Sequence, residues 1–299
     1  VGACLADDMG LGKTVQTLAL LLRRAPEGPA LVVAPTSVCH NWLDEARRFA
    51  PTLRAKLFGN GDRQKLLDEL EPFDVVVCSY GLLQSEQEKI TGRPWTTVVL
   101  DEAQAIKNAA TKRSQAAMAL DADFRVATTG TPIENHLGEL WNLFRFLNPG
   151  LLGSKKRFDA RFAVPIERDH DRKARRLLKE LVSPFILRRT KSQVLSDLPP
   201  RTEVVRKVDL STDEAALYET LRIKALEQLD GDREDSAGAR HLKVLAELMK
   251  LRRAACHPKL VLPESKLSGA KLETLVEIVT DLTDGGHKAL VFSQFVDHL

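Results

Sequence analysis

Apolar runs alternate with amphipathic stretches along the first half of the chain. Between the runs lie patterns with helical spacing, such as SVCHNWLDEARRF and KRSQAAMAL. Continuous apolar strands separated by helices predict an α/β fold with a parallel sheet covered on both faces. Ligands of such sheets gather at the carboxyl ends of the strands, so the polar residues that close the runs are candidates for a site. The strand candidates are ALVVAP (30–35), FDVVVCSY (73–80), TTVVLDEA (96–103) and FRVATTGTP (124–132).

The pattern changes after Pro149 and Gly150. Residues 151 to about 200 predict basic helices that close with LPP, and a β-like TEVVRKVDLS follows. Long amphipathic helices come next, with a polar break at 231–239. The stretch HLKVLAELMKLRRAAC predicts a helix with a core-facing stripe, and KALVFSQF near the end predicts a buried strand. The stripe consists of Leu242, Leu245, Leu248 and Met249.

Composition indicates a globular protein with a hydrophobic core. The 299 residues suffice for about two domains, and 43% of them are hydrophobic against 28% charged. The longest aliphatic run, Leu18 to Leu22, is far shorter than the roughly 20 residues that cross a bilayer, so we expect no membrane contact. The scattered cysteines form no CxxC pair, which argues against a zinc site or a disulfide framework and fits a reducing cytoplasm.

The net charge of +3 is unevenly distributed. Residues 151–207 contain 16 Lys and Arg against 7 Asp and Glu, a net charge of +9, which leaves −6 for the rest of the chain. A local basic region in a near-neutral protein indicates a polyanion partner. A solvated helical surface would have the same composition, so charge alone leaves both interpretations open.

The stretch MGLGKT, close to the first residue, has the composition of a phosphate-binding loop. Gly10 and Gly12 let the backbone turn tightly and present N–H groups to phosphate oxygens, at the positive end of a helix expected from about Thr14. Lys13 can neutralise the β- and γ-phosphates, and the Thr14 hydroxyl can bind Mg²⁺. The common pattern has glycine where Asp7 stands, so an ordinary glycine turn is the alternative for this stretch alone.

A second motif decides between these two interpretations. The run TTVVLDEAQ delivers Asp101 and Glu102 at the carboxyl end of a predicted buried strand. One carboxylate can hold Mg²⁺ while the other orients the attacking water, which is what hydrolysis of a nucleoside triphosphate requires. An Asp-Glu pair is common on surfaces, but a pair that ends a buried strand after a glycine-lysine-threonine loop indicates a nucleotide triphosphatase.

A third strand end, at VATTGTPIEN, carries the small hydroxyl residues Thr128, Thr129 and Thr131. Their hydroxyls can bond to the carboxylates and to a segment that moves on hydrolysis. A plain strand-to-helix cap, with Thr131 and Pro132 opening a turn, explains the same residues, and the motif by itself favours that cap.

A series of motifs resembles the Swi/Snf family of DNA-dependent ATPases, which are helicase-like proteins of superfamily two. In chain order the motifs are LADDMGLGKTVQT, VVAPTSVCHNW, DEAQAIKN, TTGTPIENHLGELWNLFRFLNP, FILRRTKSQV, LRRAACHP and KALVFSQF, so the resemblance covers nearly the whole chain. The four-residue box is DEAQ, where many relatives have histidine last. Both carboxylates are kept, so we expect the chemistry to survive this difference. The family's phosphate loop does not follow the glycine-first pattern, which accounts for Asp7.

The resemblance implies two RecA-like lobes with ATP and Mg²⁺ in the cleft and double-stranded DNA running across both. Residues 1–150 would form lobe one, 151–203 a basic helical insertion with the inter-lobe connection, and 204–299 the start of lobe two with a helical insertion at about 212–262. The family's upstream adenine-recognition segment and its later arginines cannot be matched here. We therefore expect a chain truncated at both ends that, alone, binds nucleotide weakly and shows no DNA-stimulated hydrolysis.

By position, the resemblance also assigns residues to the ATP site. Thr14 and Asp101 would hold Mg²⁺, and Glu102 would act on the water. Gln104 would link hydrolysis to lobe movement together with Thr129, Gly130 and Thr131. The residues assigned to catalysis are Lys13, Asp101, Glu102 and Gln104, and those assigned to ATP are Asp7, Asp8, Met9, Gly10, Leu11, Gly12, Lys13 and Thr14.

A further set of residues is assigned to DNA by the same resemblance. One group follows the strand predicted at ALVVAP (30–35), and the other belongs to the connection between the lobes. They are Pro35, Thr36, Ser37, Asn41 and Trp42 in the first group, and Arg188 and Arg189 in the second.

The predicted function is an ATP-dependent duplex-DNA translocase that acts as a monomer and remodels or displaces a DNA-bound protein. The alternatives are a strand-separating helicase and a nucleotide-gated DNA-binding scaffold without turnover. Only 5% of residues are aromatic and they do not interleave with the basic cluster, which favours contact with phosphates over base stacking. The alanine- and arginine-rich composition resembles bacterial relatives, for which a cytoplasmic, nucleoid-associated location is expected; a eukaryotic protein would be nuclear.

Overall fold

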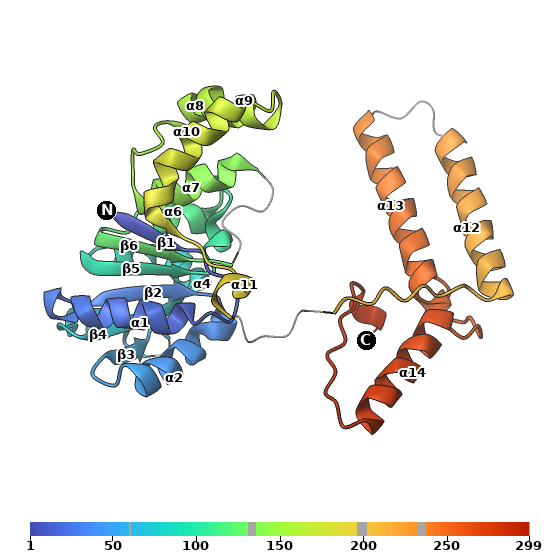
Figure 1. Cartoon of the computed structure of the whole chain (residues 1–299), viewed down its shortest axis with the longest axis horizontal. Coiled ribbons are helices and arrows are strands. Elements are labelled where there is room, and N and C mark those ends of the chain that lie inside the picture. The colour runs from blue at the N-terminus through green and yellow to red at the C-terminus, as the bar shows by residue number, and fades with distance from the viewer. Residues whose placement is uncertain (60, 131–135, 196–201, 232–236, 299) are drawn as a thin grey trace. The chain divides into compact units, whose positions relative to one another are not determined.

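The computed structural model describes residues 1–59, 61–130, 136–195, 202–231 and 237–298. The chain forms two compact units, Val1–Pro199 and Pro200–Leu299 (Figure 1). The boundary between the units falls inside the segment 151–203, predicted as a basic helical insertion with the inter-lobe connection, and the predicted division into lobes stays a prediction. Of the predicted site residues, Thr131 lies outside the described residues.

A seven-stranded sheet forms the centre of the first unit, and all of its strand pairs are parallel. The strand order is β3-β4-β2-β5-β6-β1-β7. The four strand predictions of the first half are confirmed as β2 (Ala30–Ala34), β4 (Asp74–Ser79), β5 (Trp95–Asp101) and β6 (Ala122–Thr128). The sequence pattern missed the three short strands β1 (Gly2–Leu5), β3 (Arg54–Leu57) and β7 (Ile186–Leu187).

Alternate residues of the central strands face two separate hydrophobic clusters. Val32 and Val99 pack with one helical layer, while Leu31 and Leu100 pack with the layer on the other face. Every residue of β2 and β4 is buried, which is why the centres of these strands are continuously apolar and do not alternate with polar residues. Fully burying a leucine or valine side chain contributes roughly 1.5–3 kcal/mol, so the two layers hold the sheet together.

Helices cover both faces of the sheet (Figure 1). On one face, α1 (Lys13–Arg24) and α2 (Cys39–Phe49) bury Leu18, Leu21 and Trp42. The other face of the sheet is covered by a second set of helices. These helices are α4 (Tyr80–Ser85), α5 (Gln87–Thr91), α6 (Lys112–Met118) and α7 (Leu137–Leu147), and α3 (Arg63–Asp68) adds Leu67 to the same cluster.

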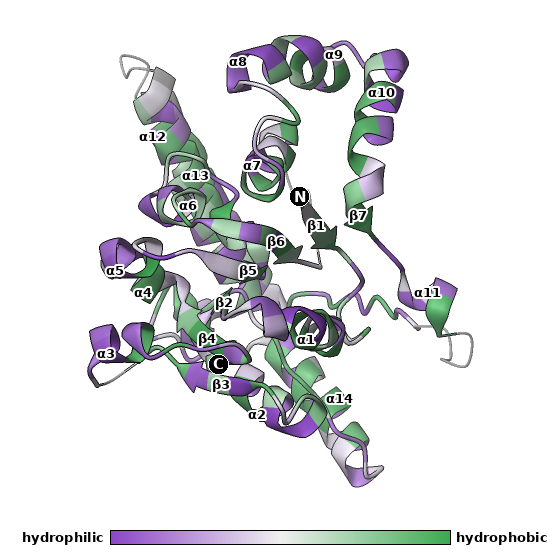
Figure 2. Ribbon diagram, turned by 90° about the vertical axis from the view of Figure 1, so that its left-hand side faces the viewer, coloured by the Kyte–Doolittle hydropathy of each residue, from purple (hydrophilic) through white to green (hydrophobic). Residues whose placement is uncertain are grey.

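The predicted basic helices after Gly150 are present as α8 (Lys155–Phe158), α9 (Val164–Glu167) and α10 (Arg172–Val182). Phe158, Phe162 and Leu178 bury against Phe144 of α7 in a third hydrophobic cluster. The chain then returns to the sheet, where β7 pairs with β1 as the last strand (Figure 2). A short helix, α11 (Lys191–Val194), follows.

The second unit consists of α12 (Thr212–Gly231), α13 (Ala237–Cys256) and α14 (Ala270–Asp284). Glu214 near the start of α12 accepts a hydrogen bond from the Ala270 backbone at 3.1 Å, which joins α12 to α14. Two strand predictions are wrong here, because neither TEVVRKVDLS nor KALVFSQF forms a strand. The described part of this unit holds no other strand with which they could pair.

The predicted core-facing stripe of α13 is also wrong. The helix forms, but Leu242, Leu245 and Leu248 are 70%, 56% and 52% exposed. An amphipathic pattern buries its apolar face only where another element covers it. No described element buries Leu242, Leu245 or Leu248, while Met249 is half-buried. None of the described helices is both long and apolar enough to cross a membrane.

Candidate nucleotide site

The phosphate-loop candidate lies between the end of β1 and the start of α1. Gly10 and Gly12 have φ values of 86° and 74°, which residues with a side chain adopt only at a cost, so glycine is needed at both positions. Gly12 immediately precedes α1, which begins at Lys13, one residue earlier than predicted. No side chain caps this helix. Its first N–H groups and its positive end are therefore available to an anion.

The Lys13 ammonium lies over the turn that precedes the glycines. Its Nζ donates to the carbonyl of Asp7 at 2.8 Å and to that of Asp8 at 3.4 Å. Thr14 follows in the first turn of α1, partly exposed. The loop thus brings an ammonium, a hydroxyl and the free amides of a helix start to one place, which is the chemistry that binds a polyphosphate.

Asp101 ends β5, and four residues hold its carboxylate and backbone in position. Thr128 donates to Oδ1 at 2.5 Å, and the Glu102 backbone donates to the same oxygen at 3.0 Å. The Trp42 indole donates to Oδ2 at 2.9 Å. The Tyr80 hydroxyl donates to the Asp101 carbonyl at 2.8 Å, and burial raises the pKa of Tyr80, so this hydroxyl keeps its proton. Such outer partners orient a carboxylate that binds a metal ion.

Trp42 is the buried member of the group that was assigned to DNA from the sequence. Its side chain is 2% exposed and bonds to Asp101. DNA contact stays a prediction for Trp42, whose indole has its partner inside the fold. Thr36, Ser37 and Asn41 are exposed at the turn from β2 into α2, next to the half-buried Pro35, and for these residues DNA contact stays a prediction.

Glu102 has an unusual backbone conformation for a residue with a side chain. Its φ of 49° and ψ of 56° are left-handed, which costs roughly 1–2 kcal/mol. Strain of this kind clusters at functional sites, where the surrounding structure imposes it. Here the turn directs the chain from β5 into the 3₁₀ helix Ala103–Ile106, which carries Gln104.

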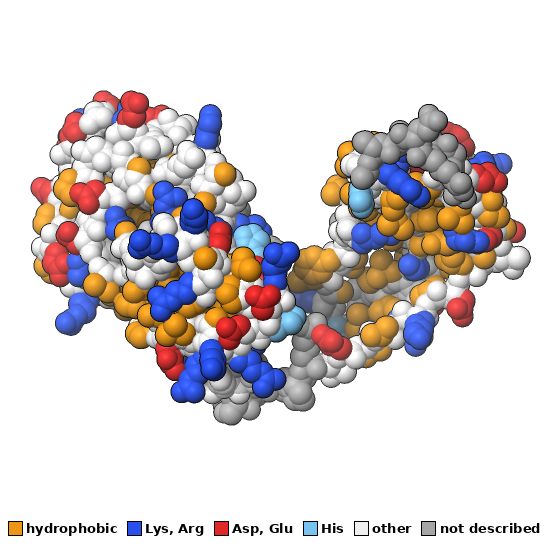
Figure 3. Space-filling model, turned by 90° about the horizontal axis from the view of Figure 1, so that it is seen from above, with side chains coloured by type: hydrophobic (Ala, Val, Ile, Leu, Met, Phe, Trp, Pro, Cys, Tyr) orange, Lys and Arg blue, Asp and Glu red, His pale blue; other side chains and the backbone are white. Residues whose placement is uncertain are grey.

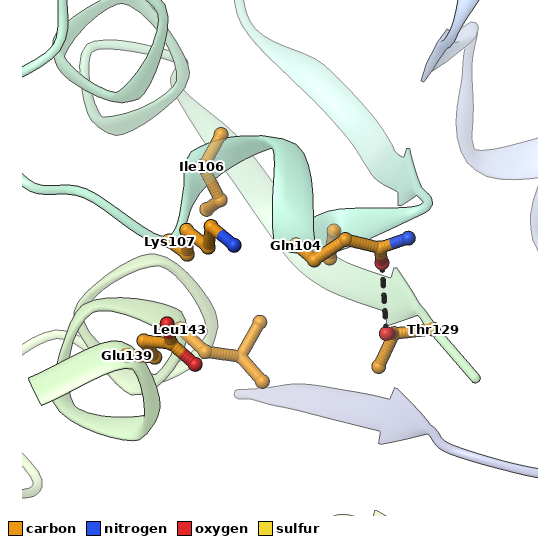
Figure 4. Close-up of a pocket in the computed structure, with 7 residues that line it drawn as sticks. Gln104, Ile106, Lys107, Thr129, Glu139 and Leu143 are labelled. Atoms are coloured by element: carbon orange, nitrogen blue, oxygen red, sulfur yellow. Dashed lines mark hydrogen bonds between the residues drawn. The ribbon is translucent and has the colours of Figure 1, made fainter. Parts of the chain in front are cut away.

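A hydrogen-bonded chain connects the acidic pair with the coupling motif. The Gln104 amide donates to Glu102 Oε2 at 2.7 Å, and its carbonyl oxygen accepts from the Thr129 hydroxyl at 2.9 Å (Figure 4). A glutamine amide can donate and accept at the same time. The strand ends of β5 and β6 are thereby joined through one side chain, and the coupling role of Gln104 and Thr129 stays a prediction. Gly130 follows Thr129 directly.

A small pocket lies behind this chain, between the 3₁₀ helix and α7. Lys107 and Glu139 line it beside Gln104 and Thr129 (Figure 4). Deeper in the fold, the buried amide of Asn142 donates to the Ile106 carbonyl at 2.6 Å and to Ser114 at 2.8 Å, so α7 fixes the turn that carries Gln104. No sequence motif marks Asn142, because its partners lie in distant segments.

Arg188 and Arg189 lie against the phosphate loop. Arg189 Nη2 approaches Asp7 Oδ2 to 2.5 Å, and the Asp7 side chain is 0% exposed. This contact lowers the pKa of Asp7 and outweighs the effect of burial. Arg188 donates to the carbonyls of Ala6 and Gly130 at 3.0 and 3.1 Å. The two arginines, assigned from sequence to DNA, therefore have partners in the ATP site, and a contact with DNA stays a prediction for both.

A group of exposed basic residues lies away from this site, on α8 and α10. Several Lys and Arg side chains are visible on the end of the first unit that faces the viewer in Figure 3. The exposed members are Lys155, Lys156 and Arg157 on α8 and Arg172, Lys173, Arg175, Arg176 and Lys179 on α10. Their exposure is compatible with a polyanion partner and with a solvated surface.

The parallel sheet, the glycine-lysine-threonine loop after β1 and the Asp-Glu pair after β5 define a RecA-like nucleotide-binding lobe. The chain belongs to the SNF2-related domain family, whose model matches residues 1–260. The resemblance found in the motifs is thereby confirmed, and so is the predicted α/β class with its parallel sheet.

Individual relatives agree with the family. A putative ATP-dependent helicase/translocase of Bacillus subtilis, YwqA, is 41% identical over 99% of this chain and 33% of its own length. An ISWI chromatin-remodeling complex ATPase of Arabidopsis thaliana is 35% identical over 98% of this chain and 29% of its own length. The chain thus spans about a third of the curated relatives it matches.

The solved structures include the SWI2/SNF2 ATPase core of Sulfolobus solfataricus in complex with dsDNA. It is 39% identical, superposes with a TM-score of 0.62, and the match covers 99% of this chain and 63% of that one. The Sulfolobus solfataricus SWI2/SNF2 ATPase core domain is also 39% identical and gives a TM-score of 0.60.

Proposed function

We propose that the protein is an ATP-dependent motor that moves along duplex DNA and remodels or displaces proteins bound to it. The observation that carries this proposal is the chain from Glu102 through Gln104 to Thr129, beside the Lys13 loop. It joins a candidate catalytic carboxylate to a second strand end, as a hydrolytic site that drives movement requires. The family, and a relative solved with dsDNA, support the nucleic-acid part of the proposal.

The residues present fit ATP and Mg²⁺. Mg²⁺ prefers oxygen ligands, and the site offers the Asp101 carboxylate and the Thr14 hydroxyl. The ion supplies positive charge that neutralises the phosphate oxygens during phosphoryl transfer. Lys13 and the free amides at the start of α1 bind phosphate oxygens, while the partners of Asp101 keep its carboxylate oriented.

In this proposal Glu102 holds the attacking water, and Gln104 holds Glu102. Because Gln104 also accepts from Thr129, a change at Glu102 reaches the end of β6 and the segment that follows it. This is the path by which hydrolysis is coupled to lobe closure. Contact with DNA is assigned to Thr36, Ser37 and Asn41, which are small, polar and exposed, and so suit phosphate contacts that carry no sequence preference.

ATP turnover of the complete gene product, with and without duplex DNA, tests the proposal. We expect hydrolysis that DNA stimulates and that Lys13→Ala abolishes. Glu102→Gln should keep nucleotide binding but lose turnover by roughly 100- to 1000-fold, the usual cost of one such electrostatic contact. Parental turnover in Glu102→Gln would show that the catalytic assignment is wrong.

Two further assays separate the alternatives. Displacement of a protein block from duplex DNA, without unwinding of a forked duplex, is expected of a translocase acting as a monomer. Unwinding of the fork would identify a strand-separating helicase instead. DNA binding that responds to ATP without turnover would identify a scaffold. A nucleoid-associated position in the cytoplasm is the location that we propose for a bacterial protein.

A further inference from the structure

The segment Arg188–Lys191 grips the phosphate loop from the edge of the sheet. The β1–β7 ladder continues beyond the two strands, because Ala6 N donates to Leu187 O at 2.7 Å and Asp8 N donates to Arg189 O at 3.0 Å. At the other end of the segment, Lys191 N donates to Asp8 Oδ2 at 3.1 Å. The backbone just before the glycines is therefore tied to a segment about 180 residues further along the chain.

Arg189 is the central side chain of this grip. Its guanidinium and its own backbone N–H all bond to Asp7, with the backbone contact at 2.9 Å and the side-chain contacts at 2.5 to 3.2 Å. Asp7 is fully buried, and a buried carboxylate is tolerated only where it is paired and hydrogen-bonded. Arginine suits this position because its planar fork can meet both carboxylate oxygens, which lysine cannot do.

A second path leads from Arg189 to the loop. Arg189 Nη2 donates to Gln16 Oε1 at 2.6 Å, and the Gln16 amide donates to the Leu11 carbonyl at 3.0 Å. Leu11 lies between the two glycines of the loop. The carbonyls of Asp7 and Asp8, which accept hydrogen bonds from the Lys13 ammonium, belong to the stretch that is bonded to this segment. Arg189 thus fixes the loop on both sides of Gly10.

We propose that Arg189 is a positioning residue of the nucleotide site and acts through Asp7 and Gln16 on the loop that binds phosphate. The role rests on the proposed nucleotide-binding function of that loop. It differs from the DNA contact assigned to Arg189 from sequence, and it requires no contact between Arg189 and the nucleotide. Without the grip, the loop amides and Lys13 would sample positions that do not fit a polyphosphate, so affinity would fall while the chemistry of Glu102 stayed intact.

The test compares Arg189→Lys and Asp7→Asn with the parent in the complete gene product. Arg189→Lys keeps the charge and loses the fork, and Asp7→Asn keeps the shape and loses the charge. Arg176→Lys is the matched control, because Arg176 forms an exposed ion pair with Glu180 on α10. The probe is a fluorescent ATP analogue with Mg²⁺, and KM and kcat for ATP are measured beside its affinity.

We expect each variant to weaken probe binding and raise KM by about 10-fold or more, with a much smaller change in kcat and none in the control. The double variant should be no worse than the worse single one, because both changes break the same grip. Unchanged affinity, or a loss that affects kcat alone, overturns the proposal. So do independent effects that multiply in the double variant.

A readout without nucleotide keeps this inference separate from the proposed function. Hydrogen exchange of the amides from Asp8 to Thr14 should be about 10-fold faster in Arg189→Lys than in the parent, with the sheet amides of β2 and β4 unchanged. Faster exchange throughout the unit would indicate global destabilisation and overturn a positioning role. If the parent bound no probe, with Lys13→Ala identical to it, the nucleotide function would fail and the positioning role with it. Normal binding in the parent with unchanged loop exchange in Arg189→Lys would overturn the positioning role alone.

Discussion

The Trp42 indole donates a hydrogen bond to Asp101 Oδ2 at 2.9 Å. Trp42 belongs to α2, whose first turn and preceding turn hold the exposed residues assigned to DNA, while Asp101 is the proposed Mg²⁺ ligand. One buried side chain therefore connects the two proposed functional regions of the first unit. Sequence alone could place Trp42 in a motif, but the partner of its N–H is 59 positions away.

Trp42→Phe should lower kcat more than it lowers stability. Phenylalanine fills most of the same buried space but lacks the N–H donor, so the Asp101 carboxylate loses one of its hydrogen bonds. A hydrogen bond to a charged group contributes about 1.5–3 kcal/mol, so we expect turnover to fall by roughly 10-fold or more at saturating ATP and Mg²⁺. Steady-state ATPase assays of the complete gene product measure this.

Trp141→Phe is the control for that experiment. The Trp141 indole donates to the Gly153 carbonyl at 3.0 Å, far along the chain from the acidic pair. Equal losses of turnover in the two variants would mean that tryptophan packing, and not the bond to Asp101, governs the rate.

Thr129→Val should reduce DNA stimulation more than basal turnover. The substitution keeps the shape of the side chain and removes the hydroxyl that donates to Gln104. Glu102 keeps its bond from Gln104, so the water-holding group stays in place while its link to β6 is lost. We expect the ratio of DNA-stimulated to basal ATPase rates to fall several-fold. An unchanged ratio in both Thr129→Val and Gln104→Leu would remove the coupling role of this chain.

Acid stability should depend on Asp7. Arg189 holds the pKa of Asp7 below its ordinary value of 3.8. A carboxyl with a lowered folded pKa adds stability that is present above the unfolded pKa and is lost as pH falls through the folded one. Asp7→Asn should therefore cost stability at neutral pH, and the difference from the parent should shrink below about pH 4.

The size of that pH effect should be modest. Arg189 is 40% exposed, so solvent screens the pair and we expect on the order of 1 kcal/mol. Urea unfolding between pH 2.5 and 7 measures it. Asp44→Asn, which removes the charge from an exposed pair with Arg47, is the control, and its free energy of unfolding should differ from that of the parent by the same amount at every pH. A constant difference between Asp7→Asn and the parent at every pH would contradict this assignment.

DNA affinity of the complete gene product should fall steeply with salt and depend little on sequence. The proposed contacts are small polar groups and basic side chains, which meet phosphates and release counterions on binding. Titrations of a fluorescent duplex at several salt concentrations, with two unrelated sequences, give the slope and the preference. A binding curve that does not respond to salt would exclude phosphate contact as the main interaction.

Much of the first unit could be predicted because its signals are local. The centres of β2, β4 and β5 are continuous apolar runs, since both of their faces are buried, and glycines mark the loop before α1. β7 could not be predicted, because two residues are too few to show a hydrophobic periodicity. Only its pairing with β1 makes it a strand. The strand predicted at KALVFSQF shows the reverse case. Its pattern is right for a strand, yet Leu290 is 86% exposed and the described part of its unit offers no neighbouring strand.

The sequence motifs mark the residue types of the candidate site, but they do not show which residues bond to them. Lys13, Asp101 and Glu102 stand in motifs whose spacing carries their role. The left-handed turn at Glu102 and the bonds of Asp101 to Trp42 and Thr128 depend on strands that are brought together only in the folded sheet. No periodicity along the chain encodes such contacts between distant segments.

Because β1 pairs with β7, the sheet can be completed only late in the synthesis of the first unit. Leu5 leaves the ribosome near the beginning of this chain, and Leu187, its neighbour in the sheet, is synthesised some 180 residues later. At roughly 5–20 residues per second, the edge of the nascent sheet beside the phosphate loop stays open for on the order of ten seconds or more. β1, the first strand to be synthesised, thus gains its second neighbour only when β7, the last strand of the sheet, has been made. A chaperone that shields an open sheet edge would act during that interval.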